Sequence, residues 1–95
     1  MSAASDVAEY LRKHGCVVWV TGTNHKARAT KGLPDLFVLH SNWGGAIAFE
    51  VKAGTDRPRA AQRQRKAEWE SAGGLWVFGY MEEARALLKA SGILV

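Results

Sequence analysis

The sequence predicts a single α/β domain over residues 1–95, with elements in the order helix, strand, strand, strand, helix, strand, helix. Four short apolar runs, rich in β-branched and aromatic residues, lie among stretches whose apolar residues recur at helical spacing. Glycines stand at several of the boundaries. The chain has 95 residues, of which 47% are hydrophobic, and this is sufficient for one modest core.

The first helix is expected over residues 6–14, because Val7, Tyr10 and Leu11 fall on one stripe and Gly15 can end the helix. The apolar, β-branched run that follows, at 16–21, predicts the first strand. Residues 22–31 carry no regular apolar pattern and several basic side chains. We expect this segment to be a loop.

A β-hairpin is expected next, because the apolar runs 35–39 and 46–52 are joined by a short polar and Gly-rich segment. With the turn centred near Trp43, the two residue numbers of each cross-strand pair add up to about 86 along an antiparallel ladder. Asp35 then lies opposite the stretch 50–52.

The second half predicts a helix, a strand and a last helix. Thr55 or Asp56 can cap a helix whose first turn holds Pro58 and which runs to residue 72. Residues 75–78 predict a strand. A final helix is expected over 81–91, with these residues facing inward: Ala84, Leu87 and Leu88.

Three charged side chains converge at one end of the predicted hairpin: Asp35, Glu50 and Lys52. Alternation places Glu50 and Lys52 about 7 Å apart on the strand face that also carries small residues. Mg²⁺ prefers oxygen ligands, which Asp35, Glu50 and the main-chain carbonyl of Val51 can supply. Lys52 can orient or deprotonate an attacking water and offset charge on a phosphate. The pattern predicts a metal-dependent phosphodiesterase, although solvated strand residues with a weak ion pair give the same pattern.

Basic residues flank these acids in the sequence. The net charge is +4, the pI is about 9.6, and one basic stretch of ten residues contains no acid. One basic group lies within residues 26–31 and the other within residues 57–66. Both groups can hold phosphates of a polyanion such as DNA, or they can form a polar loop and a solvated helix face. The residues expected to contact DNA are Lys26, Arg28, Lys31, Arg57, Arg59, Arg63 and Lys66.

Cellular location is expected to be the cytoplasm. The N-terminal residues lack the basic and apolar segments of a secretory signal, and the lone Cys16 has no partner for an internal disulfide. Cys16 is expected to be a small core residue. The three histidines have no metal-ligand spacing among themselves.

Three short segments carry a family likeness: Gly32-Leu33-Pro34-Asp35, Phe49-Glu50-Val51-Lys52 and Arg59-Ala60-Ala61-Gln62. Together with the order of elements, they resemble the VRR-NUC family of the PD-(D/E)XK nuclease superfamily. The resemblance implies a restriction-endonuclease-like core with a mixed sheet flanked by helices. It also implies Asp35 and Glu50 as metal ligands, Lys52 as the catalytic lysine, Gln62 as an accessory active-site residue, and Mg²⁺ or Mn²⁺ as cofactor.

The resemblance further implies a stand-alone phage or bacterial endonuclease that acts as a homodimer, similar to Holliday-junction resolvases and to enzymes of DNA repair. Related nucleases often carry a glutamate on the first helix that reaches the metal, commonly at a place occupied here by residues 3–5. Glu9 lies closer to the helix end, so it is a doubtful metal ligand. A capping pair with Asp6, or a solvated charge, is its expected role.

Two functions remain open from the sequence, an endonuclease for branched DNA and a DNA-binding module that keeps the nuclease fold without turnover. The two acids favour the endonuclease, since acids facing a polyanion need a cation between them. Three of the tryptophans are expected to be structural: Trp19, Trp69 and Trp76. Trp43 is expected to be exposed at the hairpin tip, where it would contact a second subunit or stack on a base.

Overall fold

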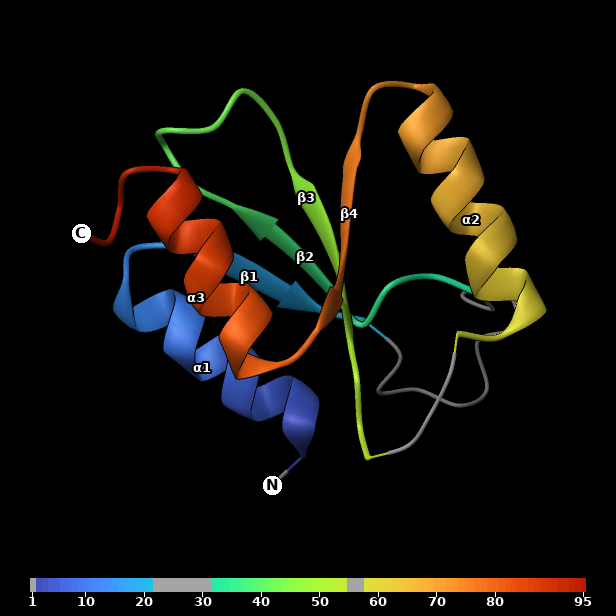
Figure 1. The fold of residues 1–95 in the computed structure, drawn as a ribbon, viewed down its shortest axis with the longest axis horizontal. Helices are drawn as coiled ribbons and strands as arrows, with labels where there is room; N and C mark the ends of the chain where they lie inside the picture. Colours follow the sequence, from blue (N-terminus) through green and yellow to red (C-terminus); the bar gives the residue numbers. More distant parts are fainter. Residues whose placement is uncertain (1, 22–31, 55–57) are drawn as a thin grey trace.

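The computed structural model describes residues 2–21, 32–54 and 58–95 (Figure 1). The element order is α1 (Ala3–Lys13), β1 (Val17–Val20), β2 (Leu36–Leu39), β3 (Ile47–Val51), α2 (Ala60–Ser71), β4 (Leu75–Gly79) and α3 (Met81–Ala90). The predicted order of helices and strands is therefore confirmed. None of the described helices is long and apolar enough to cross a membrane.

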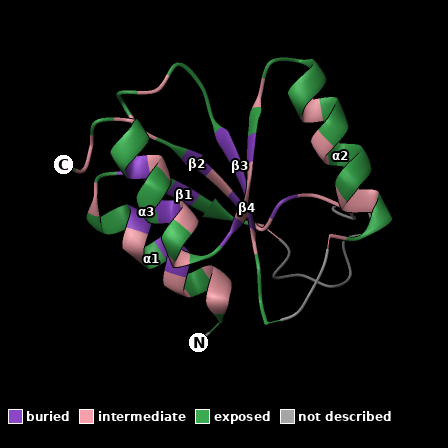
Figure 2. Ribbon diagram, viewed as in Figure 1, coloured by how far each residue is buried: buried purple, intermediate pink, exposed green. Residues whose placement is uncertain are grey.

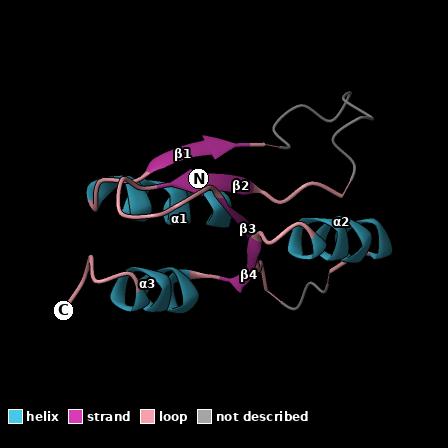
Figure 3. Cartoon of the chain, turned by 90° about the horizontal axis from the view of Figure 1, so that it is seen from above, coloured by secondary structure: helices cyan, strands magenta, loops and turns pink. Residues whose placement is uncertain are grey.

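The strands form one mixed sheet in the order β1-β2-β3-β4. β1 with β2, and β2 with β3, pair antiparallel, whereas β3 and β4 pair parallel. The parallel pair requires a crossover connection, which α2 supplies. α1 and α3 lie on one face of the sheet and α2 lies on the other (Figures 1 and 3). The sheet predicted from the family resemblance is confirmed.

The main core lies between the sheet and the pair α1 and α3, where Figure 2 shows most of the buried positions. The side chains of Leu11, Leu36, Phe49 and Leu88 are fully buried there. Ala84 is also fully buried, as the spacing on the last helix predicted. This apolar packing holds β3 in place, and β3 carries Glu50 on its other face.

The hairpin register differs by one residue from the expected one. Leu36 pairs with Phe49 and Val38 with Ile47. Residues that pair directly share a face of the sheet, so this register puts Leu36 and Phe49 together in the core. The expected register would have placed Leu36 on the face that carries Glu50. Burial of two large apolar side chains therefore decides the register, and continuing the ladder brings Asp35 beside Glu50.

α1 begins three residues earlier than predicted. Ser2 caps it, with its Oγ accepting a hydrogen bond from Ser5 N at 3.1 Å, while Ser5 Oγ accepts from Ser2 N at 3.0 Å. The expected capping pair of Asp6 and Glu9 is therefore wrong. Asp6 lies inside the helix instead, where its Oδ2 accepts a hydrogen bond from the Tyr80 hydroxyl at 3.1 Å.

α2 begins later than predicted, at Ala60, so Pro58 precedes the helix. The proposed caps Thr55 and Asp56 lie outside the described residues. The Gln62 side chain serves the helix start, since its Oε1 accepts a hydrogen bond from Arg59 N at 3.0 Å. A polar side chain within the first turn thus takes the place of an upstream cap.

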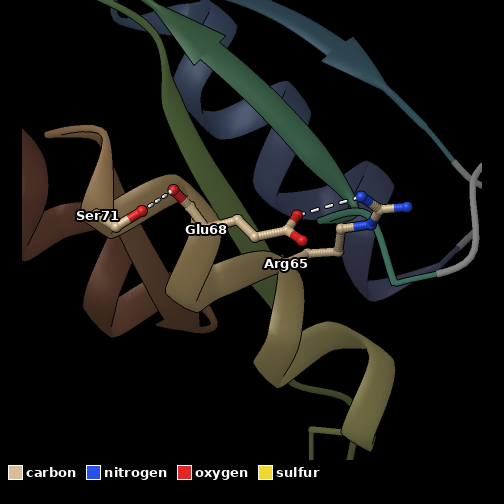
Figure 4. Close-up of polar contacts among 3 residues, drawn as sticks. All are labelled: Arg65, Glu68 and Ser71. Atoms are coloured by element: carbon tan, nitrogen blue, oxygen red, sulfur yellow. Dashed lines mark hydrogen bonds and ion pairs between the residues drawn. The ribbon is translucent and has the colours of Figure 1, made fainter.

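The exposed side of α2 carries local polar contacts (Figure 4). Arg65 Nη1 lies 3.2 Å from Glu68 Oε1, and the Ser71 hydroxyl donates to the Glu68 carbonyl at 2.8 Å. Lys66 Nζ lies 3.0 Å from Glu70 Oε1. Solvent-exposed pairs of this kind contribute at most about 1 kcal/mol each. They neutralise much of the basic charge that the sequence places on this helix.

Two tryptophans differ from their predicted environments. Trp43 is half-buried against the core rather than exposed at the hairpin tip, and its indole Nε1 is buried without a partner among the described residues. Trp19, expected to be structural, is 72% exposed, because it lies on the edge strand β1 beyond the reach of α2. Trp69 and Trp76 are structural as predicted, with Trp69 packing on Phe37 at a ring separation of 5.6 Å.

Replacing Leu11 by Ala is expected to lower the free energy of unfolding by about 2–5 kcal/mol, because the fully buried side chain leaves a cavity between α1 and the sheet. Urea unfolding followed by circular dichroism measures this difference. Glu9→Ala, at an exposed position of the same helix, is the control and should change stability by less than about 0.5 kcal/mol. Equal effects of the two substitutions would contradict the assigned burial.

Candidate active site

Two carboxylates stand on neighbouring strands at the end of the hairpin. Asp35 precedes β2, and its Oδ2 accepts a hydrogen bond from the Val51 backbone N–H at 2.7 Å. This bond holds the Asp35 side chain against β3. Glu50 lies within β3 and is only 4% exposed, although it is a charged residue. The convergence of Asp35 and Glu50, predicted from the hairpin register, is present in the fold.

A pocket of about 350 Å³ opens beside these two acids. It lies between the end of β3 and the start of α2. Its walls come from the residue before β2, the end of β3 with the segment after it, β4 and the start of α2. Its lining residues are Asp35, Glu50, Val51, Ala53, Arg59, Gln62 and Phe78. Of the residues predicted to form a site, Asp35, Glu50, Val51 and Gln62 are thus brought together.

The two acids are held in an environment that opposes their charge. Burial raises the pKa of Asp35, and the hydrogen bond from Val51 N–H partly offsets this shift. Burial also raises the pKa of Glu50, the nearby Asp35 charge raises it further, and a hydrogen bond from the Trp76 side chain lowers it. Both carboxylates would therefore be stabilised by a cation placed between them.

The start of α2 is fixed against the entry to β2 by a close backbone approach. At Gly32 an added Cβ would lie 2.6 Å from the Ala61 carbonyl oxygen, and φ is +83°. Only glycine fits both the space and the left-handed conformation without strain. This contact brings the segment that leads to Asp35 next to the helical turn that carries Gln62.

Gln62 has one end of its amide engaged. Its Oε1 accepts the hydrogen bond from Arg59 N, so the amide nitrogen is the end with hydrogens to donate. Gln62 also lines the pocket. One side chain thus serves both the helix start and the pocket wall, and its role as an accessory active-site residue stays a prediction.

Lys52 directly follows β3, which ends at Val51, and its role as the catalytic lysine stays a prediction. The Lys52 side chain is exposed and is not among the pocket-lining residues, while its backbone N–H donates to the Gly79 carbonyl at 2.7 Å. The structure therefore fixes the Lys52 backbone and leaves its side chain at the outer edge of the site.

Glu9 does not join the acid pair. It is exposed on α1, which packs against the opposite face of the sheet from the pocket. Within residues 2–21, 32–54 and 58–95, no group of three or more His, Cys, Asp or Glu side chains comes together as a metal cluster. Cys16 is buried as predicted, and burial raises its pKa.

The basic residues predicted to contact DNA are only partly described. Four of them lie outside the described residues: Lys26, Arg28, Lys31 and Arg57. Arg59 lines the acid pocket, and Arg63 and Lys66 line a neighbouring groove of about 400 Å³. The pocket and the groove share Glu50, Gln62 and Phe78. A continuous concave surface therefore runs from the acids along one side of α2.

Sequence reasoning missed the contribution of β4. Phe78 lines the pocket, and Trp76 lines the groove and lowers the pKa of Glu50. Both residues follow from the parallel register, in which Ala48 pairs with Trp76 and Glu50 with Phe78. Placing a parallel strand beside β3 in the sequence analysis would have identified them.

The fold can be compared with that of solved structures. The chain has a mixed four-stranded sheet flanked by helices, with two acids at the end of a central hairpin. A solved structure described as a VRR_NUC domain superposes with a TM-score of 0.69 and 21% sequence identity, covering 92% of this chain and 90% of that chain. The chain thus has the fold of a VRR_NUC domain, as its motifs indicated. No family model matches the chain, and the search among curated proteins finds no match.

The raised carboxyl pKa values predict how stability depends on pH without metal. The folded protein binds protons at Asp35 and Glu50 more tightly than the unfolded chain does, so stability falls as the pH rises from the ordinary values of 3.8 and 4.5 through the raised ones. Glu50→Gln is expected to flatten this fall. Urea midpoints measured from pH 4 upward in EDTA test the expectation.

Glu9→Gln is the control for this pH series, because Glu9 is exposed and should leave the wild-type profile unchanged. Parallel profiles for wild type and Glu50→Gln would show that Glu50 is not destabilised in its charged form.

Proposed function

We propose that the protein is a divalent-metal-dependent endonuclease that hydrolyses phosphodiester bonds of branched DNA as a homodimer. The observation that carries the proposal is the pair of acids, Asp35 and Glu50, enclosed in one pocket with the start of α2. The fold shared with a VRR_NUC domain supports it. The name of that domain points to nuclease chemistry, and the pocket holds the residue types that such chemistry needs.

The donor set fits a hard divalent cation such as Mg²⁺ or Mn²⁺. Two carboxylates with raised pKa values repel each other when both are charged, and a cation relieves that repulsion. Asp35, Glu50 and the main-chain carbonyl of Val51 would hold it. When bound, the ion would supply Lewis acidity and lower the pKa of a coordinated water.

The remaining site residues act on the water and the phosphate. The amide nitrogen of Gln62 is the donor end of its side chain, so it would hydrogen-bond the attacking water or a phosphate oxygen. The Lys52 side chain starts at the pocket edge and has a flexible four-carbon stem. It would reach inward with DNA bound, orient or deprotonate the water, and offset the charge that builds on the phosphate.

A DNA-binding module without turnover is the second candidate, and the position of Lys52 outside the pocket lining is the observation that favours it. The buried Glu50 argues against it. A binding surface for a polyanion gains nothing from an acid that is 4% exposed beside a second acid, unless a cation bridges the acids and the phosphate.

DNA recognition is proposed to depend on phosphates and on DNA shape. The surface beside the pocket carries Arg59, Arg63 and Lys66, which are suited to phosphate contacts. A chain of 95 residues presents one such pocket among its described residues. Two cuts in one branched substrate would therefore require a second subunit.

An apolar strip on the edge strand β1 supports the homodimer. Val17, Trp19 and Leu39 are 54%, 72% and 44% exposed. Register places Val17 beside Leu39 and Trp19 beside Phe37, so these side chains share one face, where they line a groove of about 340 Å³. No described charged residue lines this groove. It suits a second copy of the chain better than DNA, and an exposed apolar edge is otherwise an aggregation risk.

Cleavage of a labelled four-way junction, beside a matched linear duplex, tests the nuclease. We expect nicking of the junction with Mg²⁺ or Mn²⁺ and none with EDTA. Glu50→Gln and Lys52→Ala should each reduce the rate by at least about 100-fold, since one loses a metal ligand and the other a charge-stabilising group. Glu82→Gln, at an exposed position of α3, is the control. Binding without cleavage in either metal would favour the non-catalytic module.

Sedimentation velocity tests the homodimer and its surface. Trp19→Lys is expected to shift the wild-type dimer to a monomer, because it places a charge in the middle of the apolar strip. Leu75→Lys is the matched control, since Leu75 is 50% exposed on the opposite edge strand β4. A monomeric wild type, or a dimer that survives Trp19→Lys with its fold intact by circular dichroism, would contradict this part of the proposal.

A further inference from the structure

We propose that Arg59 is the residue that binds the phosphate group next to the carboxylate pair, with its guanidinium placed in the pocket on the side opposite the metal ligands. The inference rests on the proposed function and extends it. The sequence predicts Arg59 as one of several basic residues that contact DNA. In the structure, Arg59 differs from the other described members of this set because it lines the acid pocket.

Arg59 is the described cationic residue that lines the acid pocket. It shares the walls with Asp35, Glu50 and Gln62. Arg63 and Lys66 line only the neighbouring groove, and Lys52 lies outside both. A phosphate that bridges to a cation on the two carboxylates would therefore meet Arg59 before any other described basic side chain.

The backbone of Arg59 is held in place. The residue directly precedes α2 in an extended conformation, with φ −79° and ψ 163°, and its N–H is bonded to Gln62 Oε1 at 3.0 Å. The following turn is packed on Gly32, where the Ala61 carbonyl leaves no room for a Cβ. The origin of the Arg59 side chain is thus set by two contacts that do not involve its guanidinium.

The other basic residues of α2 have partners within the protein. Lys66 pairs with Glu70 at 3.0 Å, Arg65 with Glu68 at 3.2 Å, and Arg63 Nη1 donates to the Pro58 carbonyl at 2.7 Å. Among the ion pairs and side-chain hydrogen bonds of the described residues, none uses the Arg59 guanidinium. With respect to the described residues, its five N–H donors are open to a ligand.

The chemistry of the pocket favours an arginine in this role. A guanidinium presents two parallel N–H groups that match two non-bridging phosphate oxygens, and it stays charged at all working pH values. It would orient the phosphate while the carboxylates hold the cation on the other side. Gln62, whose Oε1 binds the Arg59 N–H, couples the position of Arg59 to the amide that faces the same pocket.

A binding experiment separates this role from a general charge effect. Four-way junctions carrying a single neutral methylphosphonate at successive positions are titrated with protein in Ca²⁺, which leaves the DNA uncut. Wild type is expected to show one position at which the modification weakens binding by about 10-fold or more, the size expected for a lost charge-assisted hydrogen bond. Arg59→Ala should weaken binding to unmodified DNA by a similar factor and show no further loss at that position.

Two further variants sharpen the test. Arg59→Lys should recover part of the binding, because a lysine keeps the charge but not the paired N–H geometry. Arg65→Ala is the matched control, since it also removes one positive charge, from within α2, and it should keep the wild-type position pattern. If Arg59→Ala keeps the wild-type pattern, the proposal is wrong.

The readout is independent of cleavage. A wild type that binds the junction but cuts it in no metal would refute the nuclease, and the methylphosphonate scan would still decide whether Arg59 binds that phosphate. A wild type that cuts the junction, together with an Arg59→Ala scan identical to the wild-type scan, would refute only the role of Arg59.

Discussion

The hydrogen bond from the Val51 N–H to Asp35 Oδ2 is the contact on which the site depends. It joins the residue before β2 to the last residue of β3, so the acid that precedes one strand is fixed against the strand that carries the other acid. It also uses one carboxylate oxygen and leaves the second for a ligand. The hairpin register, decided by burial of Leu36 with Phe49 on the opposite face, brings the two partners within reach.

Each face of the sheet has a different task. The face against α1 and α3 is closely packed and apolar, and it supplies the stability that allows Glu50 to remain buried on the other side. α2 covers that other side over β4 and, through Trp69, over Phe37 of β2, which leaves a concave surface beside the acids and an uncovered apolar strip along β1. The residues that stabilise the fold and the residues of the candidate site thus lie on opposite faces of the sheet.

Local patterns predicted the order of elements and the convergence of the acid pair, whereas only the family resemblance pointed to Gln62. Alternation and helical spacing depend on residues close in the sequence, so both patterns can be recognised without knowledge of the tertiary fold. The predictions fail where residues distant in the sequence determine the environment of a side chain. Trp19 is exposed because the sheet order leaves β1 at an edge of the sheet. The start of α2 was misplaced since its cap is Gln62, a residue inside the helix.

The approach of Gly32 to the Ala61 carbonyl holds the segment before β2 against the first turn of α2 by contact between two main chains. Part of the placement of α2 relative to the acids is therefore set by the backbone and does not depend on the side chain at position 59. Redesign at position 59 can exchange the charge of the site while this backbone contact is kept.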